Sequence, residues 1–327
     1  MIMSQPLLAR LAAQDPGACV DVLAPGWTAG LCARLPGVGA CLSSPFGHGE
    51  LKLLERFRLG RSLARRGYQR VYVLPNSIKS ALAPWFAGIP ARVGYIGESR
   101  YGLLNGLHSL DKLAVPRMVD RYYALGFAPG EAPALHPAPD PVLRADPDAL
   151  AASLARLAIP SFDQGPLVLC PGAEFGPAKR WPVRHFAAAA AHALRQGVPV
   201  WILGSAKDRG VADAIVAGAA QSINLCGRTD LSEAIDLMSV ASGVITNDSG
   251  LMHMAAALRV PTVAVFGSSS AQFTPPLSPR ARALSLGLAC SPCFARECPL
   301  GHLDCLEGLL PEQVLDALAA MQAPTAQ

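Results

Sequence analysis

Five short apolar runs alternate with helical segments in the second half of the chain, and this alternation constrains the fold most strongly. The runs cover 167–170, 198–203, 223–225, 243–246 and 261–266. The intervening segments, 182–196, 206–220 and 231–242, have the composition of helices. The first of them begins with Pro182 and stops at Gly197, which are typical start and stop signals. Strands that alternate with helices predict a parallel, doubly wound α/β sheet.

The first half repeats this architecture less regularly. We predict strands at 19–23 and 71–74, and helices at 5–13 and 51–66. A proline-rich stretch, 129–147, is typical of a linker or rim between the halves. The sequence therefore predicts two domains, 1–160 and 161–327, each with a Rossmann-like arrangement.

Composition excludes several classes of protein. Hydrophobic residues make up 51% and charged residues 16%, which favours a globular fold over disorder. The formal net charge of +4 is too small to indicate nucleic-acid binding by itself. No uninterrupted apolar run of about 18 residues is present, and no secretory signal is visible. We therefore expect a cytoplasmic protein without a transmembrane segment.

Two strand–loop–helix joints, 171–182 and 246–253, carry most of the functional information. The start of a helix presents free backbone N–H groups and a positive dipole end, which is where α/β proteins bind phosphate. The first joint supplies Lys179, either a surface lysine or a clamp for a diphosphate. The second joint supplies Asp248, Ser249 and Gly250, which form either a plain helix cap or a ligand contact. His253 lies within the first turn of the helix that follows, close to the same joint. Together they predict a diphosphate ligand of the nucleotide-sugar kind.

Two features of the first half suggest an anionic partner. The helix predicted at 51–66 and the residues up to Arg70 are rich in arginine and also carry Leu53, Leu54 and Phe57. Such a face either rests on an anionic membrane surface or is a solvated helix face. Asn76, Ser77 and Lys79 follow a predicted strand, where they either meet an anionic substrate or form a simple turn.

Four of the nine cysteines, Cys290, Cys293, Cys298 and Cys305, lie close together in the sequence. Their spacing matches only half of the paired C-x2-C pattern of zinc sites. The alternatives are a structural metal, reduced thiols that pack a compact loop, and a disulfide. No Walker A or G-x-G-x-x-G sequence and no Ser-His-Asp arrangement is present.

With these residues in view, the chain resembles the bacterial lipopolysaccharide heptosyltransferases, which form glycosyltransferase family 9. The resemblance covers essentially the whole chain, and its matching stretches are 74–82, 86–90, 100–105, 171–182, 204–208, 247–258 and 273–278. It implies a GT-B fold, in which two Rossmann-like domains face a cleft. It also implies an inverting transfer that needs no metal or other cofactor.

The resemblance further implies what each domain binds. The C-terminal domain would bind ADP-L-glycero-D-manno-heptose through Gly172, Glu174, Lys179, Asp248, Ser249, Gly250 and His253. The N-terminal domain would bind a Kdo-containing lipid A core that already bears one heptose, through Asn76, Ser77 and Lys79. The enzyme would act as a peripheral protein at the inner face of the cytoplasmic membrane. Addition of the first or third heptose is the alternative within the class.

One departure from the family affects catalysis. Members begin with a strand that leads into a Gly-Asp loop, and that Asp is the expected general base. Here 1–5 resemble the helix start that follows, so the first strand and the base are expected upstream of Met1. Asp21, within the strand predicted at 19–23, does not replace the base. A catalytically inactive nucleotide-sugar-binding protein is therefore a further alternative.

Overall fold

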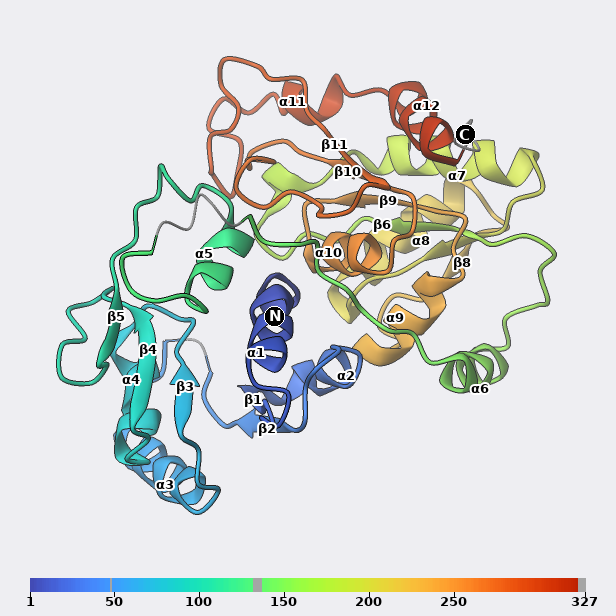
Figure 1. The fold of residues 1–327 in the computed structure, drawn as a ribbon. Coiled ribbons are helices and arrows are strands. Elements are labelled where there is room, and N and C mark those ends of the chain that lie inside the picture. Colours follow the sequence, from blue (N-terminus) through green and yellow to red (C-terminus); the bar gives the residue numbers. More distant parts are fainter. Residues whose placement is uncertain (48, 132–136, 323–327) are drawn as a thin grey trace, which may run out of the picture. The chain divides into compact units, whose positions relative to one another are not determined.

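The computed structural model describes residues 1–47, 49–131 and 137–322, which divide into two compact units (Figure 1). Unit 1 contains residues 3–29 and 37–139, and unit 2 contains 30–36 and 140–327. The boundary at 139/140 falls inside the predicted linker, and the predicted boundary at 160/161 stays a prediction. Within the described residues, no helix is long and apolar enough to cross a bilayer.

Unit 2 is built on one parallel sheet with the order β11-β10-β9-β6-β7-β8, the arrangement typical of Rossmann folds. Its strands are β6 (Leu167–Cys170), β7 (Val200–Ile202), β8 (Ile223–Asn224), β9 (Gly243–Asn247), β10 (Thr262–Val265) and β11 (Ala281–Leu284). Five of these lie where the sequence predicts strands. The central β6, β9 and β10 are buried along their whole length, as strands covered on both faces must be.

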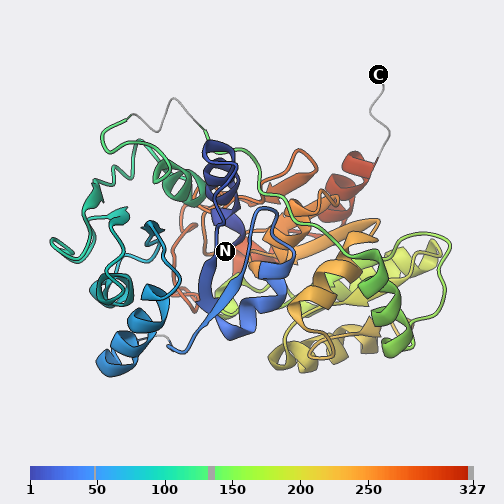
Figure 2. The same ribbon diagram turned by 60° about the horizontal axis from the view of Figure 1, so that its bottom comes forward.

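Helices cover both faces of this sheet (Figures 1 and 2). The helices of unit 2 are α6 (Pro147–Leu157), α7 (Val183–Arg195), α8 (Arg209–Gly218), α9 (Leu231–Ser239), α10 (Gly250–Ala257), α11 (Asp304–Glu307) and α12 (Pro311–Gln322). Val263 and Val265 of β10 share a core with α7, α8 and α12, whereas Ala264 packs with Met252 of α10. Because neighbouring strand residues point to opposite faces, the sheet is doubly wound, as predicted.

Unit 1 has two separate parallel sheets in place of one. β1 (Val22–Pro25) pairs only with β2 (Cys41–Ser44), and β3 (Arg70–Tyr72), β4 (Ala91–Tyr95) and β5 (Gly106–His108) form the second sheet. The helices around them are α1 (Gln5–Gln14), α3 (Leu53–Ala64), α4 (Ile78–Phe86) and α5 (Met118–Ala124), and the short α2 (Ala29–Ala33) crosses from unit 1 into unit 2.

A cavity of about 2200 Å³ lies in unit 1 beside both sheets. All of β1 and β3 line it, together with apolar side chains of α1 such as Leu7 and Leu11. β1 and β3 each have one edge without a strand partner among the described residues. Such an edge carries backbone N–H and C=O groups that no ladder pairs.

Two strands of unit 1 differ from their predicted ranges. β1 begins at Val22 and not at residue 19, because the Asp21 carboxylate accepts the Ala40 N–H at 2.9 Å and also bonds the Tyr68 hydroxyl. Asp21 therefore lies just outside the strand, which corrects its predicted placement. β3 ends at Tyr72, ahead of Pro75, which has no N–H to give to a ladder.

Candidate active site

The candidate site of unit 2 lies at the carboxyl edge of its sheet. β6, β9 and β10 are neighbours and all parallel, so the loops that follow them meet at one edge. These loops begin at Pro171, Asp248 and Phe266, and the first two are the joints that the sequence singles out. Ligands of doubly wound sheets bind at this edge.

Lys179 and Asp248 form an ion pair at the centre of this edge. The lysine Nζ lies 2.5 Å from the carboxylate Oδ2, and the side chains are 17% and 6% exposed. Lys179 also lies 5.0 Å from the centroid of the Phe175 ring. A lysine beside the positive end of a helix dipole needs a nearby anion. Here the protein supplies that anion itself as Asp248, which lies 69 positions away in the sequence.

Asn247 holds the two joints together, a role that the sequence did not predict. Its side chain is fully buried. Its Oδ1 accepts the backbone N–H of Trp181 at 2.9 Å, and its Nδ2 donates to the Pro171 carbonyl at 2.7 Å. One amide thus fixes both ends of the 171–182 loop against the end of β9, which positions Lys179 beside Asp248.

Helix α10 begins at the same edge with an open N-terminus. Ser249 is in the N-cap position, but its hydroxyl makes no capping hydrogen bond, contrary to the capping alternative. A Cβ built on Gly250 meets no heavy atom within 4 Å, so open space lies beside this backbone. Together these leave free N–H groups at a positive dipole end.

His253 lies in the first turn of α10. Burial lowers its pKa to about 4, while the Asp248 carboxylate partly offsets this effect. The imidazole is therefore neutral at pH 7, which suits a hydrogen-bonding role and makes it a weak proton acceptor.

Gly172 and Glu174 lie in the same loop in different surroundings. A Cβ on Gly172 would stand 2.6 Å from the Asp208 carboxylate, so only glycine fits there. That carboxylate accepts both the backbone N–H and the hydroxyl of Ser205, at 2.9 and 2.7 Å. Glu174 is exposed and pairs with Lys207, whose ammonium lowers the pKa of the glutamate. The structure therefore directs Glu174 to Lys207 and not to the Lys179–Asp248 pair.

Ser268 and Ser269 are further candidates that the sequence analysis missed. They follow β10, and the Ser268 N–H donates to the Ala178 carbonyl, next to Lys179. Their hydroxyls are buried and have no hydrogen-bond partner among the described residues. A buried hydroxyl without a partner is costly unless a ligand or water satisfies it. The run Gly267–Ser270 after a buried strand was the available signal.

The polar loop of unit 1 that was predicted to bind an acceptor is held by Arg100. This guanidinium is fully buried and donates to the Pro75 carbonyl at 2.6 Å and to the Asn76 side chain at 3.4 Å. Burial lowers the pKa of Arg100. Asn76 is exposed and Ser77 and Lys79 are partly buried, so the three lie together in one ordered loop.

The four clustered cysteines are not arranged as a metal site in this structure. Within the described residues, no group of three or more His, Cys, Asp or Glu side chains is arranged to hold a metal ion. Cys290, Cys293, Cys298 and Cys305 are free thiols. Backbone hydrogen bonds from 300–303 lower the pKa of Cys298, whereas burial raises that of Cys305. Of the alternatives, free thiols in a compact loop agree with this arrangement.

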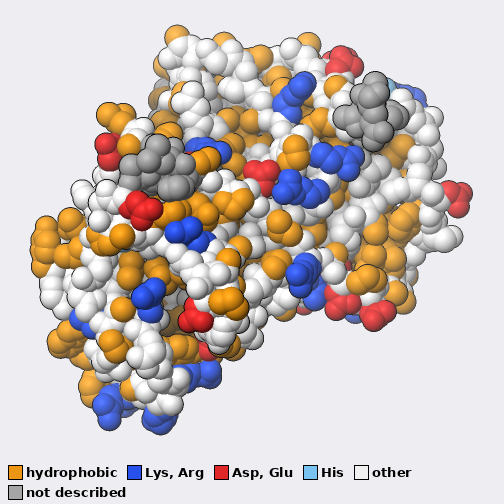
Figure 3. Space-filling view, viewed as in Figure 1, with side chains coloured by type: hydrophobic (Ala, Val, Ile, Leu, Met, Phe, Trp, Pro, Cys, Tyr) orange, Lys and Arg blue, Asp and Glu red, His pale blue; other side chains and the backbone are white. Residues whose placement is uncertain are grey.

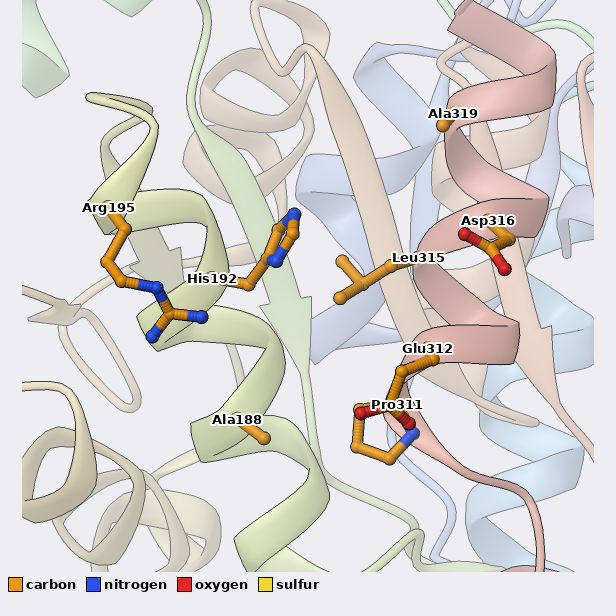
Figure 4. A pocket seen from close by; sticks show the side chains of 8 residues that line it. All are labelled: Ala188, His192, Arg195, Pro311, Glu312, Leu315, Asp316 and Ala319. Carbon is orange, nitrogen blue, oxygen red and sulfur yellow. The ribbon is translucent and has the colours of Figure 1, made fainter.

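A smaller pocket of about 250 Å³ lies elsewhere in unit 2, between α7 and α12 (Figure 4). His192, Arg195 and Asp316 are among the residues that line it. None of the lining residues belongs to the loops at the carboxyl edge, so this pocket is separate from the site described above.

Two α/β units with parallel sheets and a carboxyl edge suited to phosphate agree with the GT-B class of glycosyltransferases. Residues 56–304 match the family described as glycosyltransferase family 9 (heptosyltransferase), and the chain belongs to this family.

Two relatives and a solved structure are similar to this chain over most of its length. Lipopolysaccharide heptosyltransferase 2 of Escherichia coli K12 is 43% identical, over 98% of this chain and 94% of its own. Lipooligosaccharide heptosyltransferase 2 of Haemophilus ducreyi is 44% identical, over 86% of this chain and 84% of its own. The structure of E. coli ADP-heptose lps heptosyltransferase II superposes with a TM-score of 0.88 at 41% identity, covering 98% and 95% of the two chains.

Proposed function

We propose that this enzyme moves L-glycero-D-manno-heptose from ADP-heptose to the heptosyl-Kdo2-lipid A inner core in lipopolysaccharide core biosynthesis. The observation that carries this proposal is the 43% identity with E. coli lipopolysaccharide heptosyltransferase 2 over 98% of the chain. Identity of this extent spans both units, and so includes the acceptor-binding half as well as the donor-binding half.

The donor diphosphate binds at the carboxyl edge of unit 2 in this proposal. Lys179 supplies the positive charge, the open start of α10 supplies N–H groups, and Ser268 and Ser269 supply hydroxyl donors. Lys179 then divides its hydrogen bonds between Asp248 and a phosphate oxygen. These donors stabilise the charge that develops on the departing ADP. Gly172, Glu174, Gly250 and His253 line the rest of the donor site.

The reaction is one inverting displacement at the anomeric carbon, and no metal or cofactor takes part. A base removes the proton of the acceptor hydroxyl while the bond to ADP breaks. His253, with a pKa of about 4, is too weak a base for this step at neutral pH. This proposal therefore assigns no base among the residues of the candidate site.

The acceptor binds through Asn76, Ser77 and Lys79 of unit 1. The buried Arg100 keeps this loop in one conformation, which lowers the entropic cost of binding. Because the acceptor is a membrane-borne lipid, the enzyme works as a peripheral protein at the inner face of the cytoplasmic membrane.

Transfer assays with purified protein test the proposal. ADP-heptose is supplied together with either Kdo2-lipid A or heptosyl-Kdo2-lipid A, and ADP release and product mass are followed. Transfer only to the second acceptor supports the proposal, and transfer only to the first identifies a heptosyltransferase I. Binding of ADP without transfer to either acceptor would indicate the non-catalytic alternative. A protein that binds neither ADP nor ADP-heptose refutes all of these.

A further inference from the structure

Helices α3 and α4 of unit 1 carry apolar side chains that the fold does not bury. Leu53, Leu54 and Phe57 are 52%, 60% and 45% exposed on α3, and Trp85 is 45% exposed on α4. Surface hydrophobic residues are ordinary when they are scattered, but a cluster of large ones indicates an interaction site. We call these four residues, with Arg58, Arg61 and Arg65, the α3–α4 face.

The aromatic side chains of the α3–α4 face are closely packed. Phe86 stacks edge-on against both Phe57 and Trp85, with ring centroids 5.3 and 5.1 Å apart, so these aromatic side chains are contiguous. Gly60 allows the helices to approach closely, since a Cβ there would stand 2.5 Å from the Phe86 Cβ. The fold itself therefore holds these side chains together.

Arginines share this exposed side of α3. At about 100° per residue, Arg58, Arg61 and Arg65 follow Leu54 and Phe57 along the same side of the helix. The opposite side is buried, at Arg56, Gly60 and Leu63. Figure 3 shows Lys and Arg side chains gathered beside hydrophobic ones at the lower end of the view, where α3 lies in Figure 1.

These arginines are free to meet an external anion. Among the described residues, no ion pair involves Arg58, Arg61 or Arg65. Glu55, the acidic residue of α3, lies 3.9 Å from Lys52. Lys52 also lies 3.0 Å from Glu50, so the nearby carboxylates are already matched by a lysine.

The exposure of this face does not come from the open sheet edges. Its members are absent from the lining of the 2200 Å³ cavity, which includes Leu51, Arg56, Leu63 and Ile78. A symmetric contact between two copies would bring like charges together and leave the arginines unmatched. Apolar side chains next to arginines instead fit an interface where lipid tails meet anionic headgroups.

We infer that the α3–α4 face docks on the surface of an anionic lipid bilayer. Leu53, Leu54, Phe57 and Trp85 enter the boundary between headgroups and acyl chains, and the three arginines contact the headgroup phosphates. This inference rests on the proposed function, because a membrane-borne acceptor is what gives docking a purpose. The α3–α4 face would then be the surface by which the enzyme attaches to the membrane, as the proposed function requires.

Vesicle co-sedimentation tests the inference. The full chain should bind vesicles of phosphatidylcholine with phosphatidylglycerol and should bind pure phosphatidylcholine far more weakly. The triple variant R58Q/R61Q/R65Q should lose about a hundredfold in partitioning. The triple lysine variant at the same positions should retain binding, because it keeps the charge. The control R195Q/R282Q, which removes two exposed arginines of unit 2, should behave like the wild type.

Tryptophan fluorescence gives a second measurement that needs no arginine variant. In a Trp27→Phe background, Trp85 is the exposed tryptophan, because Trp181 and Trp201 are buried. Brominated lipids in anionic vesicles should quench it. Absence of binding by the wild type, equal binding to neutral vesicles, or an unquenched Trp85 would overturn the inference.

A soluble acceptor separates this inference from the proposed function. Heptose transfer to a deacylated inner core needs the donor and acceptor sites but no membrane. The R58Q/R61Q/R65Q variant should transfer to it at the wild-type rate while failing to bind vesicles. If the variant binds vesicles normally but loses this transfer, the face recognises the acceptor and the docking inference is wrong. If the wild type binds vesicles but transfers to no acceptor, the proposed function fails by itself.

Discussion

Replacing Lys179 by methionine should destabilise the protein, because the carboxylate of Asp248 would then be buried without its cation. Asp248 is 6% exposed and its ion pair with Lys179 is 2.5 Å long. Breaking such a pair from one side costs about 3–5 kcal/mol, whereas replacing both partners is often close to neutral. For a unit of this size, that loss lowers the Tm by about 6–20 °C.

The two partners should not be equivalent. Asp248→Asn leaves Lys179, which is 17% exposed and can turn its ammonium toward water. We therefore expect Asp248→Asn to cost less than Lys179→Met, about 1–2 kcal/mol. The double variant should be more stable than the sum of the single effects predicts, by at least about 1 kcal/mol.

Thermal and urea unfolding of the wild type, the two single variants and the double variant measure this cycle. Titration of the same proteins with ADP measures ligand affinity. Lys179→Met loses a charged hydrogen bond to phosphate, so its affinity for ADP should fall about 10–150-fold. A Lys179→Met protein with the wild-type Tm would refute the buried-pair reasoning. An unchanged affinity for ADP would remove Lys179 from the donor site.

Two other changes have outcomes set by the local geometry. His253 has a pKa of about 4 in the folded protein, against an ordinary value of 6.5. As the pH falls from 6.5 toward 4, only the unfolded chain takes up this proton, so the free energy of unfolding should fall. His253→Gln should reduce that fall in urea titrations over the same range. In Gly172→Ala, the new Cβ would press on the Asp208 carboxylate, so the free energy of unfolding should fall by about 1–3 kcal/mol in urea titrations. The matched variant Gly250→Ala has open space beside it, so its stability should stay within about 1 kcal/mol of wild type while its affinity for ADP falls. Equal losses of stability in the two variants would contradict this reasoning.

The central strands of the unit 2 sheet were predictable because they are buried on both faces. A strand without a solvent face reads as a continuous apolar run, and β6 and β10 begin and end within one residue of such runs. The start of β1 was harder to place, because the Ala40 N–H donates to the Asp21 carboxylate and not to a backbone carbonyl of the strand. The division of unit 1 into two sheets depends on which strands pair, which local sequence does not encode.

The candidate site was predictable in its members and less so in their pairings. Position after a buried strand identified Lys179 and Asp248, but the ion pair between them joins residues 69 positions apart. The sequence placed Asn247 just after the strand predicted at 243–246, and only the folded chain reveals that its side chain ties the 171–182 loop down. Arg100 was missed as the organiser of the Asn76 loop because arginine is rarely buried completely.

The pairing of Lys179 with Asp248 implies that this carboxylate competes with the donor diphosphate. In the free enzyme Asp248 already accepts the hydrogen bond of the lysine, and a phosphate brought to the same ammonium would stand near a second negative charge. Like charges a few ångströms apart repel by a few kcal/mol at an effective dielectric constant of about 20.

Asp248→Asn should therefore bind ADP about tenfold more tightly than the wild type, even though it transfers heptose more slowly. Calorimetric titration with ADP measures the first effect and product formation the second, and Asp316→Asn, an exposed carboxylate on α12, is the matched control. If Asp248→Asn instead weakens ADP binding as Lys179→Met does, the carboxylate positions the lysine for phosphate and does not compete with it. In the wild-type enzyme, this competition would speed the release of ADP, because the ion pair between Asp248 and Lys179 forms again as ADP leaves.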